Sequence, residues 1–100
     1  MNTEFSGIWP ILYSFFGEDG NLDRAAMRCQ VQACLTQNIQ GLAVLGLATE
    51  VHKLTSDEQL KILKWAVEDL QGKLPLAVTV SGPDASAQLQ FAKKASYLGA

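Results

Sequence analysis

The sequence of 100 residues is long enough for one small domain and too short for two. Apolar residues make up 48% of it and charged residues 18%, a balance typical of a globular chain rather than a disordered or fibrous one. Because the net charge is -2, the chain offers no basic field for a phosphate backbone, and we expect no nucleic-acid partner.

The sequence contains no signal for membrane insertion or secretion. No run of about 18 or more apolar residues occurs, so we expect no membrane partner. The first residues lack the basic region and apolar core of a signal peptide. Cys29 and Cys34 have the spacing of neither a zinc motif nor a redox pair, so we expect ordinary thiols and a cytoplasmic protein.

The first predicted unit is a strand over Ile8–Ser14 followed by a helix from about Asp23 to Gln37. Asn38 is predicted to stop this helix. Its apolar side chains recur at helical spacing and form one stripe, which comprises Met27, Val31, Cys34 and Leu35.

The second predicted unit begins with Leu42–Leu45, an apolar run typical of a strand that is buried on both faces. A helix is predicted over Ser56–Gln71, because Thr55 and Glu58 have the spacing of a capping box. Gly72 is expected to end it. The predicted apolar stripe of this helix consists of Leu60, Leu63, Val67 and Leu70.

The third predicted unit is a strand over Leu76–Val80 and a helix that follows the N-cap Asp84 and ends at Gly99. We expect this helix to turn three apolar side chains toward the core, namely Leu89, Ala92 and Ala95.

The three strand-like runs follow Gly7, Gly41 and Pro75, which are spaced 34 residues apart. All-helical tetratricopeptide arrays share this period, but here one element of each unit is strand-like and the Trp and Tyr landmarks are missing. Alternating strands and helices predict an α/β fold with a parallel sheet. Because three strands leave two open edges, we expect residues 1–100 to be the N-terminal part of a single (β/α)8 TIM barrel domain, with the remainder beyond Ala100.

Three stretches resemble, in order and spacing, the start of the dihydrodipicolinate synthase/N-acetylneuraminate lyase family: GIWPILYSFFGEDGNLD (7–23), GLAVLGLATEVHKLTSDEQ (41–59) and LPLAVTVSG (74–82). The resemblance implies a (β/α)8 barrel that forms a Schiff base between a barrel lysine and a 2-keto acid, usually pyruvate. The family's Schiff-base lysine and its phenolic tyrosine lie in later strands. We therefore expect no catalytic residue within 1–100, and no cofactor.

The family's Gly-Thr-Thr-Gly-Glu corner maps onto residues 46–50, where Leu47 and Ala48 replace both hydroxyls and Thr49 replaces the second Gly. The first family Thr belongs to a proton relay with a tyrosine, and the second contacts the keto-acid carboxylate. That carboxylate is also held by backbone N–H groups, and consecutive amides can form an anion-binding nest whatever the side chains. We expect the corner to bind substrate through Gly46, Leu47, Ala48 and Thr49, and Glu50 to pin it structurally.

Ser14 falls where the family has a Thr at the end of the first strand, so we expect it to contact the substrate. His52, the single histidine, is interpreted as a surface or subunit-contact residue, and no second ligand stands near it, so we expect no metal. A Schiff-base lysine must be desolvated inside a pocket. The lysines predicted on loops and helices do not qualify: Lys53, Lys61, Lys64, Lys73, Lys93 and Lys94.

The resemblance favours a lyase, an aldolase or a dehydratase, that acts on pyruvate-type 2-keto acids or keto-deoxy sugar acids. Leu47 cannot take part in a hydroxyl relay, which argues against the synthase reaction in particular. The alternative is a catalytically altered member that binds a small carboxylate as a sensor or structural subunit. A nucleotide-binding domain is disfavoured, because residues 16–20 are acidic and lack a phosphate-loop fingerprint. By resemblance we expect a homo-oligomer, a tetramer or a dimer.

Overall fold

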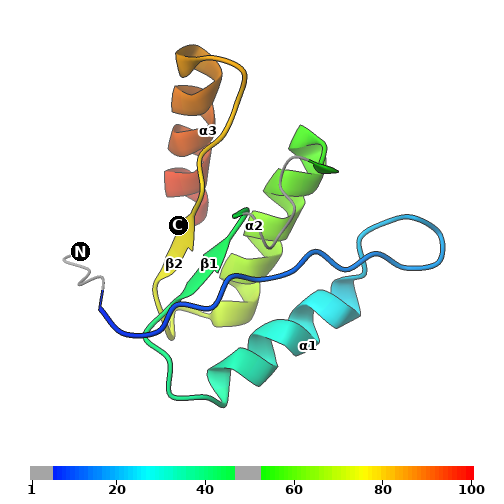
Figure 1. Ribbon diagram of the computed structural model, residues 1–100, viewed down its shortest axis with the longest axis vertical. Coiled ribbons are helices and arrows are strands. Elements are labelled where there is room, and N and C mark those ends of the chain that lie inside the picture. Colours follow the sequence, from blue (N-terminus) through cyan, green and yellow to red (C-terminus); the bar gives the residue numbers. More distant parts are fainter. Residues whose placement is uncertain (1–5, 47–52) are drawn as a thin grey trace.

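The structure, a computed structural model, describes residues 6–46 and 53–100. In chain order they form α1 (Arg24–Leu35), β1 (Leu42–Val44), α2 (Ser56–Leu70), β2 (Leu76–Val78) and α3 (Ala85–Leu98), as Figure 1 shows. β1 and β2 pair in parallel, with Leu42 opposite Leu76 and Val44 opposite Val78. Helices that alternate with parallel strands confirm the predicted α/β class.

The segment predicted as the first strand runs beside β1 but pairs with it only briefly. One parallel bridge joins Ile11 to Ala43, whose N–H donates to the Pro10 carbonyl and whose carbonyl accepts from the Leu12 N–H, both at 2.9 Å. On either side of this bridge, glutamine side chains accept hydrogen bonds from backbone N–H groups. Gln40 Oε1 accepts from the Ile8 N–H, and Gln30 Oε1 accepts from the Tyr13 N–H, each at 2.6 Å. The strand predicted over Ile8–Ser14 is thus reduced to a single bridge residue, Ile11.

The predicted stripe of α1 is confirmed, and Asp23, predicted only as the approximate start of the helix, is its N-cap. The Asp23 carboxylate accepts a hydrogen bond from the Ala26 N–H at 3.0 Å and begins the helix. The helix ends at the C-cap Thr36, slightly before the predicted stop. Of the four stripe residues, two are fully buried and two are partly buried against the core: Met27, Val31, Cys34 and Leu35.

The predicted capping box of α2 is also confirmed. The Thr55 N–H donates to Glu58 Oε1 at 2.9 Å, and the Glu58 N–H donates to Thr55 Oγ1 at 3.1 Å. The buried face of the helix is wider than predicted, because α2 packs against both α1 and the strands. Leu60 is only half-buried, whereas the buried residues of α2 are Ile62, Leu63, Ala66 and Leu70.

The helix α3 begins at its predicted cap, and the inward orientation predicted for Ala95 is confirmed, but the rest of its inward face differs. Asp84 accepts from the Ala87 N–H at 2.8 Å, and Gly99 ends the helix at a φ of 116°. The inward orientation predicted for Leu89 is wrong, since this side chain is 58% exposed. The residues that pack inward are spaced i, i+4 and i+7 on another stripe: Phe91, Ala95 and Leu98.

α1 and α2 are joined by an ion pair as well as by apolar packing. The Arg24 guanidinium donates to both Asp69 carboxylate oxygens at 2.8 Å, in the bidentate geometry that strengthens such pairs. Arg28 Nε lies 3.4 Å from the same carboxylate, and the Asp69 side chain is only 5% exposed. Arg24 also lies over the Trp65 ring, with Cζ 5.1 Å from its centroid.

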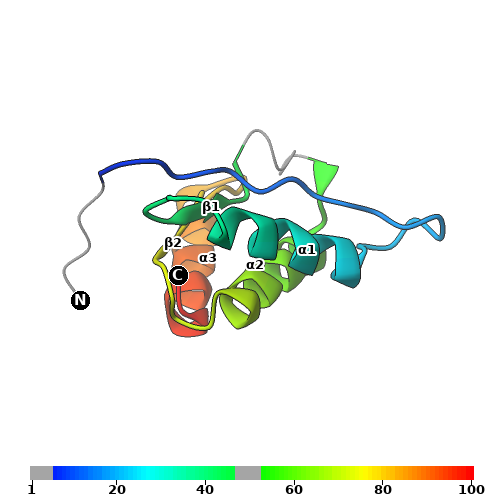
Figure 2. The same cartoon turned by 90° about the horizontal axis from the view of Figure 1, so that it is seen from below.

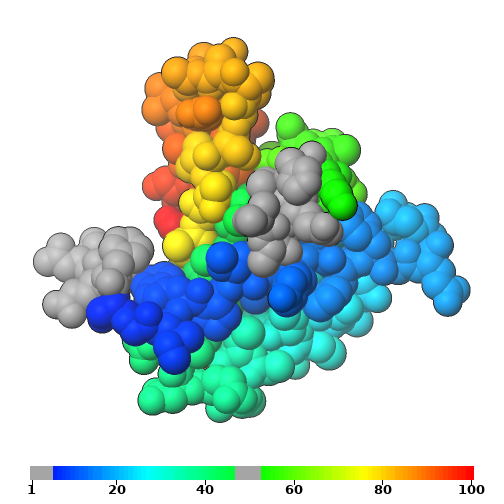
Figure 3. Space-filling model, viewed as in Figure 1, coloured from blue at the N-terminus to red at the C-terminus, as the bar shows by residue number. Residues whose placement is uncertain are grey.

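The helices lie on one side of the strands. Figure 2 shows them on the opposite side of β1 from the extended N-terminal segment. Leu42 and Val44 are fully buried toward the helices, whereas Ala43 between them is half-buried. Within the described residues, then, β1 is not buried on both faces as predicted. On the side seen in Figure 3, the N-terminal segment and the residues around β2 reach the surface.

Candidate functional site

Gly46, just after the carboxyl end of β1, lies between the extended first segment and the residue that follows β2. A Cβ atom on Gly46 would lie 3.3 Å from Ile11 Cγ2 and 3.7 Å from Thr79 Oγ1. The Thr79 N–H donates to the Val44 carbonyl at 3.1 Å, which holds the chain after β2 against the end of β1. In parallel α/β proteins, ligands bind at this edge of the sheet. Gly46, the first residue of the predicted corner, therefore lies at the edge of the sheet where a ligand is expected to bind.

Leu45 turns the chain from β1 into the corner. It adopts a left-handed conformation with a φ of 62°, which is uncommon for a residue that carries a Cβ atom. Its side chain is fully buried in the core, and this packing stabilises the unusual backbone. Strained residues of this kind persist where the surrounding structure fixes them, and they cluster at functional sites.

Two of the predicted substrate-binding residues, Ser14 and Gly46, are described by the structure. The others lie outside the described residues, together with Glu50 and His52: Leu47, Ala48 and Thr49. Ser14 is half-buried, and the atoms closest to a Cβ on Gly46 belong to Ile11 and Thr79 rather than to Ser14. The structure thus brings Gly46 together with Thr79, to which the sequence interpretation gave no role.

The backbone around Ser14 is held by α1. Gln30 clamps the preceding residue, since its Oε1 accepts from the Tyr13 N–H and its Nε2 donates to the Tyr13 carbonyl at 3.0 Å. The Phe15 N–H, on the other side, lies 3.4 Å from Met27 Sδ. These contacts fix the position of Ser14 at the end of the first segment.

The acidic turn after Ser14 is organised by its own side chains. Phe16 and Leu22 form an antiparallel bridge, and the Asn21 N–H donates to Asp19 Oδ1 at 3.0 Å. This backbone bond, and then the Asn21 side-chain amide, lower the pKa of Asp19 below its usual value.

The described lysines are all exposed and lie on helices and loops, as predicted: Lys53, Lys61, Lys64, Lys73, Lys93 and Lys94. Within residues 6–46 and 53–100, no group of three or more His, Cys, Asp or Glu side chains could hold a metal ion. Cys29 and Cys34 are free thiols, and burial raises the pKa of Cys34. No helix in the described part of the chain is long and apolar enough to cross a membrane.

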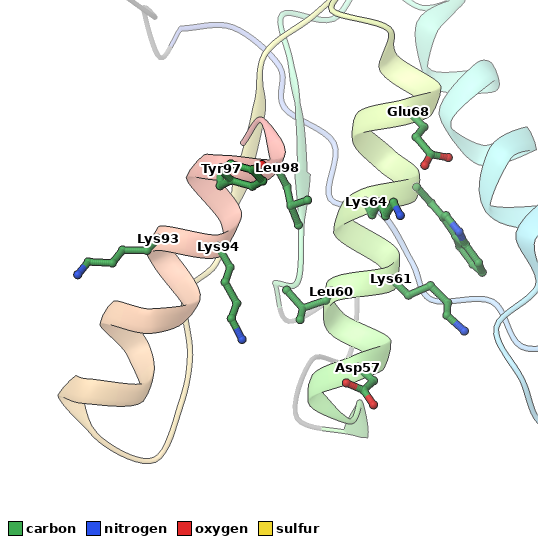
Figure 4. A pocket seen from close by; sticks show the side chains of 10 residues that line it. Asp57, Leu60, Lys61, Lys64, Glu68, Lys93, Lys94, Tyr97 and Leu98 are labelled. Carbon is green, nitrogen blue, oxygen red and sulfur yellow. The ribbon is translucent and has the colours of Figure 1, made fainter.

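A groove of about 670 Å³ lies in the helical layer, between α2 and α3. Figure 4 shows Leu60, Lys94 and Leu98 pointing into the space between the two helices, whereas Lys93 points away from it. Its lining mixes four lysines with two acidic residues: Lys61, Lys64, Lys93, Lys94, Asp57 and Glu68. This hollow is formed by helix surfaces, and Gly46 and Thr79 do not line it.

The order of elements, two parallel strands that alternate with three helices and an extended first segment bridged to β1, is that of the first three βα units of a (β/α)8 barrel. The chain belongs to the dihydrodipicolinate synthetase family, whose model matches residues 4–100. This confirms the resemblance noted in the sequence and, with it, the predicted barrel fold. The family includes lyases and aldolases.

Several relatives are similar over nearly the whole chain. It is 30% identical over 97 residues to the probable 2-dehydro-3-deoxy-D-pentonate aldolase YjhH of Escherichia coli. This alignment covers 97% of this chain and 32% of that protein. It is 29% identical over 98 residues to 4-hydroxy-tetrahydrodipicolinate synthase of Bradyrhizobium diazoefficiens. This second alignment covers 98% of this chain and 33% of that protein.

Among solved structures, YagE, a prophage protein from Escherichia coli K12 crystallised with pyruvate, matches with a TM-score of 0.90 at 25% sequence identity. The match covers 96% of this chain and 32% of that one. The chain therefore spans about a third of the length of these relatives.

Proposed function

We propose that the protein is a Schiff-base-forming lyase, an aldolase or a dehydratase, that acts on pyruvate-type 2-keto acids or keto-deoxy sugar acids. The observation that carries this proposal is the approach of Ile11 and Thr79 to Gly46, just after the carboxyl ends of β1 and β2, in a chain of the dihydrodipicolinate synthetase family. Barrel enzymes place their reacting groups at this edge. The names of two relatives, an aldolase for a deoxy-keto acid and a protein crystallised with pyruvate, support the substrate class.

In the proposed reaction, a lysine amine attacks the keto carbon and water leaves, which gives a protonated imine. The imine nitrogen withdraws the electron pair released when a C–C bond breaks or when a proton is lost before water elimination. We expect this lysine and its tyrosine partner beyond Ala100. Residues 1–100 are proposed to bind the carboxylate through the corner that starts at Gly46, with Ser14 as a further contact. Binding there would orient the keto carbon.

The replacement of both corner hydroxyls favours an aldolase or dehydratase over a synthase. A relay through the first corner hydroxyl is impossible at Leu47, and the cyclising synthase reaction needs such proton delivery. The same replacement supports a second candidate function, in which the protein binds a small carboxylate without turnover.

Reductive trapping of the full-length protein tests the proposal. Borohydride added with pyruvate, or with a keto-deoxy sugar acid such as 2-keto-3-deoxygluconate, should increase the mass of one lysine by that of the ligand, less the water lost in forming the imine, plus the two hydrogens gained on reduction. Peptide mapping should place that lysine beyond residue 100. Lactate, which has no keto group, is the matched control and should leave no adduct.

Each other outcome of the trapping experiment contradicts part of this assignment. An adduct on an exposed lysine such as Lys53 would refute the barrel site. Calorimetric binding of pyruvate without any adduct would favour the carboxylate-binding alternative. The absence of both would exclude both functions for these ligands.

A further inference from the structure

Tyr13 lies on the face of the sheet that the helices leave uncovered. Leu12, one position earlier, is fully buried in the core, and side chains alternate along an extended segment, so Tyr13 points to the opposite face. Ile11, on the same face as Tyr13, is the residue that bridges to Ala43 of β1. Tyr13 stands two positions beyond this bridge, toward the carboxyl edge at which parallel α/β proteins bind ligands.

The backbone of Tyr13 is held by one side chain of α1. Gln30 Oε1 accepts from the Tyr13 N–H at 2.6 Å, and Gln30 Nε2 donates to the Tyr13 carbonyl at 3.0 Å. A single amide thus satisfies both backbone polar groups of this residue. Gln30 is half-buried, and its helix is joined to α2 by the ion pair of Arg24 with Asp69. The place of Tyr13 at the edge is therefore set by α1.

The side chain of Tyr13 is accessible and keeps its polar group available. It is 58% exposed. Within the described residues, its contacts are made by its backbone, through Gln30, and by its ring, whose centroid lies 6.4 Å from that of Phe15. Phe15, two positions further on, is exposed as well. The pair combines two aromatic rings with one phenolic hydroxyl, which both donates and accepts hydrogen bonds.

This combination suits the chain of a keto-deoxy sugar acid better than it suits pyruvate. The carbons beyond C3 of such an acid carry hydroxyl groups, which can bond a phenol, and C–H groups, which can pack on an aromatic ring. Pyruvate ends at C3 and offers neither. A side chain that distinguishes the two ligands must contact what only the longer one has.

We propose that Tyr13 is a specificity-determining residue that binds the polyhydroxy chain of a keto-deoxy sugar acid beyond C3, and that Gln30 is its positioning residue. The phenol bonds a hydroxyl of the chain, and the rings of Tyr13 and Phe15 pack against its C–H groups. This inference rests on the proposed function, because it takes the carboxyl edge of the sheet as the substrate site. It narrows the substrate class to acids longer than pyruvate.

Three variants of the full-length protein test these roles. Tyr13→Phe removes only the hydroxyl, Tyr13→Ala removes the ring as well, and Gln30→Met removes both backbone bonds while it keeps the length of the side chain. The measured quantity is the ligand concentration that gives half-maximal borohydride trapping. For 2-keto-3-deoxygluconate we expect it to rise about 2- to 12-fold in Tyr13→Phe and in Gln30→Met, and on the order of 10- to 100-fold in Tyr13→Ala.

Pyruvate is the matched control ligand. Because it lacks the chain that Tyr13 is proposed to bind, its half-maximal concentration should stay within about twofold of wild type in all three variants. A general loss of structure would weaken both ligands alike, so the dependence on ligand separates specificity from folding. The same contrast in Gln30→Met distinguishes a positioning residue from one that only stabilises α1.

The outcomes separate this inference from the proposed function. If a variant raises both concentrations alike, or neither, the role assigned to its residue is refuted and the function stands. If wild type is trapped by pyruvate and not by the sugar acid, the specificity role is refuted and the function again stands. If wild type is trapped by neither, the Schiff base is refuted, and calorimetric titration with 2-keto-3-deoxygluconate decides: weaker binding by Tyr13→Ala than by wild type supports the inference, and equal binding or no binding overturns it.

Discussion

The two faces of the same strands differ in the size and chemistry of their side chains. Toward the helices the strands present large aliphatic residues, namely Leu12, Leu42, Val44 and Leu76, all buried. On the other face they present Ile11, Ala43, Ala77 and Thr79. Because the side-chain period of a strand is two, a single strand can stabilise the fold with one set of residues and bind a ligand with the other. Substitutions on the two faces should therefore change different properties.

The largest effect is expected on the buried face. Leu42→Ala deletes a side chain with no exposed surface, and it should lower the free energy of unfolding of the full-length protein by about 2–5 kcal/mol. Ala77→Ser, on the opposite face of the neighbouring strand, is the matched control and should change it by less than about 1 kcal/mol. Urea denaturation measures both values. Equal losses in the two variants would mean that the faces do not divide stability from binding.

A second prediction contrasts the amino ends of the strands with their carboxyl ends. A Cβ atom on Gly41 would overlap the Trp9 ring, so Gly41→Ala must displace the indole and should cost about 1–3 kcal/mol of stability. Thermal denaturation measures this loss. The double variant Gly41→Ala, Trp9→Leu should regain part of it, because the smaller side chain removes the overlap. A double variant no more stable than Gly41→Ala would show that the overlap is not the cause.

The third prediction concerns the helical layer and pH. Burial raises the pKa of Asp69, but hydrogen bonds and charge from Arg24 and then Arg28 outweigh it and lower this pKa overall. A carboxylate with a lowered folded-state pKa stabilises the fold above its unfolded pKa of about 3.9, and this contribution is lost as pH falls through the folded value. Asp69→Asn should therefore cost about 1–2 kcal/mol at pH 7 and much less at pH 3.

Glu68→Gln is the control for the pH experiment. Glu68 lies 3.4 Å from Arg24, but its side chain is 52% exposed, so this variant should change stability by less than about 0.5 kcal/mol at either pH. Chemical denaturation at the two pH values gives the comparison. A loss in Asp69→Asn that is the same at pH 3 and pH 7 would exclude the ion pair as its cause.

The features predicted correctly from the sequence are those set by neighbours along the chain. The cap at Asp84 and the capping box of Thr55 with Glu58 depend on residues three positions apart, and both are present. The family resemblance depended on similarly local motifs, and it gave the barrel fold.

The features that were missed depend on contacts between distant residues. The predicted first strand is reduced to the bridge at Ile11, and the N–H groups of Ile8 and Tyr13 donate to Gln40 and Gln30, which belong to later segments. The helix α3 carries apolar residues on more than one stripe, and its packing against α2, rather than its own sequence, selects Phe91 over Leu89. Thr79 could have been identified from its place at the end of a predicted strand, but its distance to Gly46 follows only from the register of β1 with β2.

Leu45 must meet two opposing physical requirements, one set by its backbone conformation and one by the packing of its side chain. Its left-handed backbone would be easiest for glycine, but glycine would leave a cavity where the leucine side chain now fills the core. Valine or isoleucine would fill much of that space, but branching at Cβ disfavours the left-handed conformation. Few residue types satisfy both demands, so fewer substitutions should be tolerated at Leu45 than at the equally buried Leu42. Substitutions in the core that contacts Leu45 should also alter the backbone conformation with which the chain leaves β1.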